Sequence, residues 1–303
     1  MRIPNAGRPD SPQGVALPAE GAGLRVTRDS VRRRAIVPPR GIGSQDRKTF
    51  AVTVPLWLRQ DLTRQQGLAY WRGEHGRIAC QTPGWLEYRQ HHFEPDEPGV
   101  WPDVPGVETA IPQGGQMDGV AEVTFEHAAS PLKGLRSRKV IFEDEANVFA
   151  RTILYTTGPG GGRWWRGGGS EPVGFRTVVM VRRRDGVGFW AFRNWVNDAL
   201  GRAFDAAPGV LEVRTQAFLP YIKQLWSTPG VAHDEPPEWR YQATVLLGAP
   251  DRAALDAALA SRPVAAMLER QREQCSAIHA YAVANTYVFR RDGYPTPLSS
   301  GPD

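Results

Sequence analysis

Histidine is the side chain best suited to moving protons near neutral pH, and two histidines of this sequence stand in patterned surroundings. His75 follows Trp71 by four residues and precedes Ile78 by three, which is the spacing of one face of a helix. The apolar neighbours on this face predict that His75 is buried. His92 lies further along, after a Pro-Gly pair, in a stretch that alternates as a strand does.

The strand predicted around His92 carries three polar residues on one face. Tyr88, Gln90 and His92 are two residues apart, so their side chains point to the same side of the strand. Neighbouring polar groups on a buried face are costly unless they are paired or used. Tyr88 and Gln90 could orient a ligand, and His92 could exchange protons with it.

A later stretch, residues 118–126, adds a buried acidic candidate. Glu122 is surrounded there by an alternating apolar pattern that predicts a strand. We expect a cavity lined by Tyr88, His92 and Glu122, with His75 at its mouth as the general acid or base. Trp71 and Trp57 would supply apolar contacts to the ligand. Glu122 could equally be the structural partner of an arginine such as Arg89 or Arg138.

An internal repeat predicts the elements that position these residues. The stretch that begins at Thr49 is similar to the stretch that begins at Gly174, and Pro83-Gly84 matches Pro208-Gly209 at an offset of 125 residues. Each copy has the order strand, helix, strand, strand, helix, strand, which is the ferredoxin-like pattern. Elements predicted for the later parts of the copies are strands at 118–126, 146–156, 239–247 and 278–289 and a helix at 252–274.

The predicted fold class is therefore α+β, with two tandem ferredoxin-like βαββαβ units. One such unit leaves a sheet face uncovered, so the two sheets are expected to face each other as an intrachain α/β barrel. The functional site is expected in the lumen of this barrel. Copy two has Val213, Thr215 and Ala217 where copy one has its polar strand residues, so one site of a former pair is expected to persist.

Five segments follow from this organisation, and their charges differ. They are a disordered basic leader (1–47), the first copy (48–157), a glycine-rich linker (158–173) that should tolerate no core strand, the second copy (174–291) and a tail (292–303). The leader holds nine arginines against four acidic residues, so the whole formal charge of +5 lies in it and the body is balanced. A nucleic-acid-binding body is therefore not predicted. The linker's Trp164 and Trp165 would lie on the body or cover a cleft.

The sequence YWRGEHGRIACQTPGWLEYRQHHF (70–93) resembles the EthD family of the dimeric α/β-barrel superfamily. Tyr70, Trp71, His75, Gly84, Tyr88, Gln90 and His92 stand at the family's motif positions, and Asp118-Gly119-Val120-Ala121-Glu122 is similar to its third strand. The resemblance covers residues 49–157. Because family members usually dimerise to form the barrel, it implies a fused dimer and a small-molecule enzyme, with reactions that range from dehydration, cyclisation, decarboxylation and isomerisation to oxygenation without a cofactor.

The leading hypothesis is a cofactor-independent enzyme for an apolar aromatic, quinone-like or polyketide-derived molecule. His75 and His92 would carry out acid/base chemistry, and Trp57, Trp71, Tyr88, Gln90 and Glu122 would bind the substrate. One alternative is an oxidoreductase, either cofactor-free or haem-assisted through His75 or His92, and another is a non-catalytic binding protein. No metal site, membrane segment or phosphate loop is predicted. The two cysteines indicate a cytoplasmic location, and the fused barrels could pair as a homodimer.

Overall fold

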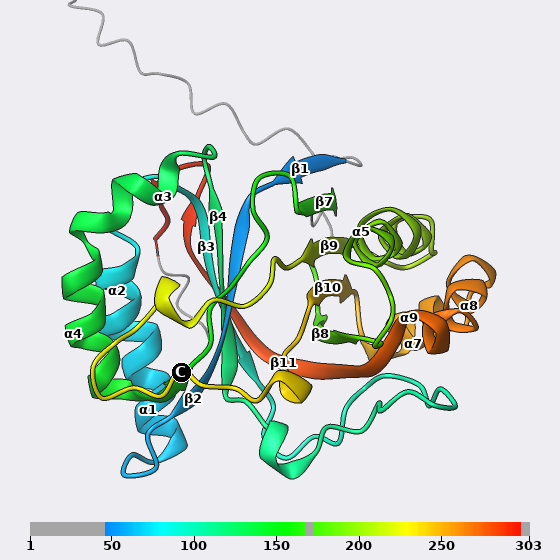
Figure 1. Cartoon of the computed structure of the whole chain (residues 1–303), viewed down its shortest axis with the longest axis horizontal. Helices are drawn as coiled ribbons and strands as arrows, with labels where there is room; N and C mark the ends of the chain where they lie inside the picture. The colour runs from blue at the N-terminus through cyan, green and yellow to red at the C-terminus, as the bar shows by residue number, and fades with distance from the viewer. Residues whose placement is uncertain (1–45, 168–171, 298–303) are drawn as a thin grey trace, which may run out of the picture. The chain divides into compact units, whose positions relative to one another are not determined.

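Twelve strands form one antiparallel sheet in the described part of the chain, which the computed structural model gives as residues 46–167 and 172–297. The strand order is β1-β7-β9-β10-β8-β11-β3-β4-β2-β5, with β6 paired to β2 and β12 paired to β11. Helices cover the outer faces of the two halves, as Figure 1 shows for α1–α4 on one side and α5–α9 on the other. The predicted α+β class with tandem ferredoxin-like halves is confirmed.

The first half runs from the first core strand to a short edge strand. Its elements are β2 (Ala51–Leu58), α1 (Arg64–Tyr70), η1 (Trp71–His75), α2 (Gly76–Ala79), β3 (Trp85–Phe93), η2 (Gln113–Gly115), β4 (Gly119–Phe125), α3 (Ser130–Lys133), η3 (Gly134–Arg136), α4 (Arg138–Val148), β5 (Phe149–Thr152) and β6 (Tyr155–Thr156). The strand predicted at 146–156 begins only at Phe149, because α4 extends to Val148, and it is interrupted after Thr152, which gives β5 and β6.

The second half repeats this order at the predicted offset. Its elements are β8 (Phe175–Arg183), α5 (Phe189–Asn194), η4 (Trp195–Leu200), α6 (Gly201–Asp205), β9 (Glu212–Ala217), η5 (Lys223–Leu225), η6 (Pro237–Trp239), β10 (Ala243–Ala249), α7 (Arg252–Leu259), α8 (Arg262–Leu268), α9 (Gln271–Gln274), β11 (Cys275–Arg291) and β12 (Tyr294–Pro295). The helix predicted at 252–274 is three short helices. Pro263 lies in the first turn of the second of them, where proline is tolerated.

Strand β11 joins the two halves. Its first part pairs with β8 from Cys275 to Val283, and its second part pairs with β3 from Val283 to Arg290. One strand of 17 residues thus completes the sheet of both halves. Figure 1 shows it as the long red-orange ribbon that crosses from one half to the other.

The predicted glycine-rich linker contains a strand, which corrects the expectation that no core strand could form there. Strand β7 (Gly162–Arg166) pairs with β9 and with β1 (Arg47–Thr49), whose first residue belongs to the predicted leader. The sequence Arg-Trp-Trp-Arg supplies side chains for both faces: Trp165 is buried in the second half's core, and Trp164 stacks on the Arg214 guanidinium. The rest of the predicted leader, 1–45, lies outside the described residues.

The interior of the barrel is occupied by ion pairs and by a buried apolar cluster that includes Phe93, Val178 and Met180, which corrects the prediction of a ligand-binding lumen. Arg89 Nη1 lies 2.6 Å from Glu212 Oε1, and Arg214 donates to Glu87 and, at 2.9 Å, to Glu122. These five side chains are all buried. Glu87 corresponds to Glu212 and Arg89 to Arg214 at the repeat offset, so each half pairs its arginine with the other half's glutamate.

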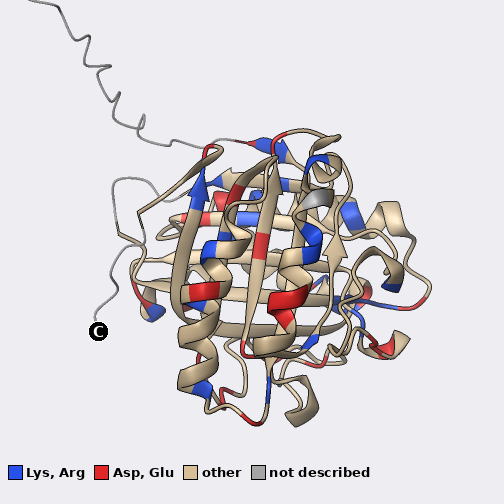
Figure 2. Ribbon diagram, turned by 90° about the vertical axis from the view of Figure 1, so that its left-hand side faces the viewer, with Lys and Arg blue, Asp and Glu red and all other residues tan. Residues whose placement is uncertain are grey.

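Charged residues outside this cluster are of both signs and dispersed. Figure 2, which faces the helices of the first half, shows blue and red residues interspersed over helices and strands. None of the helices in residues 46–167 and 172–297 is long and apolar enough to cross a bilayer.

Candidate functional site

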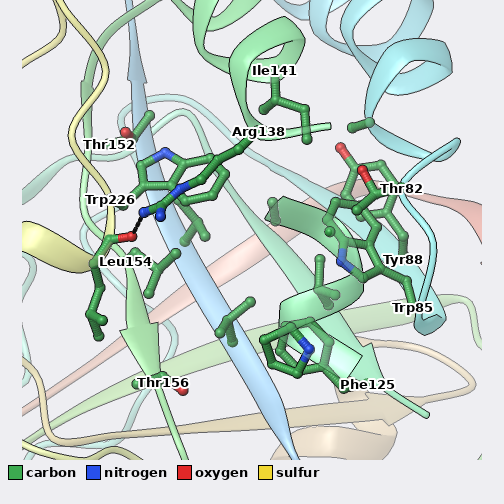
Figure 3. A pocket seen from close by; sticks show the side chains of 18 of the residues that line it. Thr82, Trp85, Tyr88, Phe125, Arg138, Ile141, Thr152, Leu154, Thr156 and Trp226 are labelled. Atoms are coloured by element: carbon green, nitrogen blue, oxygen red, sulfur yellow. Dashed lines mark hydrogen bonds between the residues drawn. The ribbon is translucent and has the colours of Figure 1, made fainter. Parts of the chain in front are cut away.

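A cavity of about 640 Å³ lies in the first half, between its helices and the outer face of its sheet. Its walls are mostly apolar and come from β2, β3, β4, the helices η1 to α4, and a segment of the second half that reaches Trp226. A cavity of this size, with few polar groups, is typical of a small-molecule site. Figure 3 shows Arg138 and Trp226 on one side of it and Thr82, Tyr88 and Trp85 on the other.

The helix that carries His75 is fixed at its start and widened in its middle. Thr63 forms a capping box with Gln66, which satisfies the first amide groups of α1. The turn Trp71–His75 is a π-helix, a wider turn that recurs at functional sites. It buries Trp71 and His75 on the side that faces the sheet and the cavity.

His75 is held by a carboxylate on the neighbouring helix. Its Nδ1 lies 2.7 Å from Asp144 Oδ2, and the Tyr70 hydroxyl donates to Asp144 Oδ1 at 2.6 Å. Burial raises the pKa of Asp144, but the hydrogen bonds from His75 and Tyr70 outweigh burial, so this pKa lies below its usual value. The ionised carboxylate accepts the Nδ1 proton and leaves Nε2 as the nitrogen that can accept a proton from a ligand.

A second acid on the same helix, Glu145, lines the cavity next to this pair. Trp226 Nε1 lies 3.0 Å from both carboxylate oxygens, and the Thr228 hydroxyl also donates to Glu145. Burial raises the pKa of Glu145. Because Trp226 and Thr228 belong to the second half, Glu145 fixes a loop of that half against the cavity of the first.

The polar face of β3 points to the helices and not to the barrel interior. Gln90 Nε2 donates to the Trp71 carbonyl oxygen at 2.9 Å and to the Tyr88 hydroxyl oxygen at 2.8 Å. His92 stacks on Trp71 with ring centroids 4.2 Å apart and also contacts Tyr287 edge-on. Burial lowers the pKa of His92 to about 3. Tyr88 and Trp71 line the cavity, whereas Gln90 and His92 lie behind them.

A comparison with protein families matches residues 59–152 to the EthD domain. The chain carries an EthD domain. The motif residues Trp71, His75, Tyr88, Gln90 and His92 all lie inside it, as does Asp144. A comparison with curated proteins found no match.

Solved structures of other proteins have a similar fold over most of this chain, so the likeness includes both halves. A "putative monooxygenase" from Lactobacillus acidophilus is 8% identical, with a TM-score of 0.50, and covers 83% of this chain and 100% of its own. Another "putative monooxygenase", from Fusobacterium nucleatum, is 6% identical, with a TM-score of 0.51. It covers 84% of this chain and 98% of its own. An anthrone oxidase-like protein is 12% identical, with a TM-score of 0.46, and covers 82% of this chain and 96% of its own. At these identities the likeness to the first two structures is one of fold.

Besides Gln90, two further predicted substrate-binding residues, Glu122 and Trp57, lie away from the cavity of the EthD domain. Glu122 is opposite Arg89 in the β3–β4 pairing, so it points into the barrel and bonds Arg214 there. Trp57 alternates with the cavity-lining residues of β2 and stacks under Arg151 on the other face. The sequence grouped Tyr88, Gln90 and His92 on one face, but it did not show that Glu122 faces the opposite way.

The second half has no counterpart of this polar site. Residues His75 and Leu200 end the corresponding turns η1 and η4, so Leu200 stands where His75 does. Leu200 and Val213 are buried in a continuous apolar cluster that also contains Trp165. The second half therefore supplies the wall residues Leu219, Leu225 and Trp226 to the cavity of the EthD domain.

The sequence did not single out Asp144, Glu145 or Thr82 as site residues. Asp144 and Glu145 belong to a charged run, EDE, that looks like a solvated helix face. Their role depends on α4 lying beside η1, which is a tertiary contact without a local signal. The described residues contain no group of three or more His, Cys, Asp or Glu side chains that could hold a metal ion.

Proposed function

We propose that this chain is an enzyme that removes a proton from a hydrophobic aromatic small molecule, with His75 as the base and Asp144 as its positioning partner. The observation that carries the proposal is that His75, held by the Asp144 carboxylate, lines a mostly apolar cavity of about 640 Å³. The aromatic walls suit a flat ring system, and the ordered pair suits proton transfer.

Among the fates of the resulting carbanion, we favour reaction with dioxygen, which makes the chain a monooxygenase-type oxidoreductase. The support is an analogy of fold with the two structures described as monooxygenases, and analogy of fold does not fix chemistry. For a tricyclic ketone such as anthrone, removal of a proton opposite the carbonyl and reaction with one O₂ gives anthraquinone and one water. Dehydration, cyclisation, isomerisation and decarboxylation would begin with the same proton transfer.

Haem is a less suitable occupant of this cavity. His75 could direct Nε2 at an iron, but His92 is enclosed by Trp71 and Tyr287. Two propionates would need cationic partners, and Arg138 is the one Lys or Arg side chain among the described residues that line the cavity. Its guanidinium already donates to the Leu225 carbonyl and stacks on Trp226. We therefore assign no step to haem.

The test is turnover of anthrone under air, followed by oxygen uptake and by the absorbance of anthraquinone. We expect His75→Gln to lower the rate at least about 100-fold, in the range that a general base contributes. Asp144→Asn should lower it less, because Nε2 remains but its tautomer is no longer fixed.

Melting temperatures of both variants and an absorption spectrum of the purified protein serve as controls. An unchanged rate in His75→Gln would refute the proposed base. A Soret band near 400 nm would contradict a reaction without haem.

A further inference from the structure

Two hydroxyl groups form a polar corner at one end of the cavity. Thr82, which follows α2, and Tyr88, on β3, both line the cavity, and Figure 3 shows their side chains next to each other beside Trp85. Thr82 is 2% exposed, and its Oγ1 has no hydrogen-bond partner among the described residues. Thr124, Thr215 and Thr244 also have a buried hydroxyl without a partner among the described residues, but Thr82 is the one of these four threonines that lines the cavity.

The direction of the Tyr88 hydroxyl follows from Gln90. The Gln90 amide oxygen faces His92 Nε2 at 3.2 Å, and its Nε2 donates to the Trp71 carbonyl and to the Tyr88 oxygen. The Tyr88 oxygen is thus an acceptor already, and its own proton finds no acceptor among the hydrogen bonds of the described residues. Burial raises the pKa of Tyr88, so this proton is present at neutral pH. Both hydroxyls can therefore donate to a ligand.

The position of this corner relative to His75 determines how a bound ligand would be oriented in the cavity. His75 and Ala79 line the cavity one helical turn apart, and Thr82 follows three residues later. Thr82 follows the end of α2, so an oxygen bound there would lie beyond the C-terminal end of the helix that carries His75. A rigid ring system held at this corner by its oxygen presents another ring position to the base.

We propose that Thr82 and Tyr88 form a subsite for one oxygen atom, a carbonyl or phenolic oxygen, of the aromatic ligand. This inference rests on the proposed function, because it takes the cavity to hold an aromatic molecule. The two donors select oxygenated ring systems over hydrocarbons of the same shape. They also stabilise the charge that reaches this oxygen when His75 removes a proton from a conjugated ring.

The experiment compares the binding of 9-fluorenone with that of fluorene by isothermal titration calorimetry. The two molecules have the same ring skeleton and differ in the oxygen, and neither needs to be turned over. We expect the wild type to bind the ketone roughly 30-fold more tightly, since each of the two hydrogen bonds contributes about five-fold. Thr82→Val and Tyr88→Phe should each reduce this preference several-fold, and the double variant should abolish it without weakening fluorene binding.

Two further variants separate recognition from effects on folding. Thr82→Ser keeps the hydroxyl and should keep the preference. Thr124→Val removes another buried hydroxyl without a partner, one that does not line the cavity, and should leave both affinities unchanged. Equal affinities in the wild type, or a preference that survives in the double variant, would refute the subsite and leave the proposed function standing. Binding of neither molecule would refute both.

Discussion

At the scale of single residues, the chemistry of the site depends on which atoms of His75 and Glu145 remain free. Asp144 occupies Nδ1 of His75, so the ring can exchange protons only through Nε2. Glu145 has a structural role instead, because its two carboxylate oxygens accept hydrogen bonds from Trp226 and Thr228. One acid of the α4 pair thus serves the base, and the other fixes the loop that closes the cavity.

Glu145→Gln should stabilise the protein at pH 8 and have little effect at pH 4. The folded state raises the pKa of Glu145, so it favours the neutral acid and loses stability as the pH rises and the carboxyl ionises. A glutamine is neutral at every pH and can still accept from Trp226. We expect a gain of about 1 kcal/mol at pH 8 by urea unfolding. A loss at pH 8 that disappears at pH 4 would mean that the ionised form is the stabilising one.

At the scale of elements, the site depends on how closely α2 approaches β11. A Cβ on Gly76, at the start of α2, would lie 2.4 Å from the Phe289 ring on β11, which no real contact allows. The same holds for Gly201, the first residue of α6, against Trp165. Both copies therefore need a glycine directly after the wide turn that carries His75 or Leu200.

Gly76→Ala should destabilise the protein by roughly 1–3 kcal/mol, because either α2 or Phe289 must move. The shift also displaces His75, so activity should fall more than stability predicts. Gly73→Ala is the matched control on the same helix, because nothing lies within 4 Å of its added Cβ. It should be neutral or slightly stabilising. Thermal unfolding and anthrone turnover measure both; equal effects of the two substitutions would show that the close approach is unimportant.

Sequence periodicity predicted the elements of this site better than their partners. The alternation in 85–93 correctly placed Tyr88 and His92 on one face, because a strand has a period of two whatever surrounds it. It could not tell which face the helices cover. That depends on pairing with β4, where Glu122 lies opposite Arg89. The strand β7 was missed because its pairing with β9 and β1 is entirely non-local.

At the scale of the whole molecule, the ion cluster determines how the halves face each other. Two members of the cluster, Glu122 and Arg176, are not related to each other by the repeat. Glu122 contacts Arg214, and Arg176 Nε lies 2.8 Å from Glu212 Oε2. With the two symmetric pairs, the cluster contains three glutamates and three arginines, so its formal charges balance. The interior that was predicted to be the active site holds the two copies in register.

Arg214→Met should destabilise the protein by about 3–5 kcal/mol, because Glu87 and Glu122 would lose their shared partner inside the barrel. Glu122→Gln should cost at most about 1 kcal/mol, since the burial that raises the pKa of Glu122 already disfavours its charge. Guanidinium unfolding at pH 7 gives both values. A larger loss in Glu122→Gln than in Arg214→Met would contradict this account of the cluster.

Strand β11 also determines when each half can finish folding during synthesis. It is the last long strand in the described part of the chain, yet β3 of the first half depends on it for one of its two neighbours. The first half therefore leaves the ribosome with an open strand edge, which is a surface prone to aggregation. The two halves can therefore complete their sheets only together, when residues 275–291 emerge, and not one after the other.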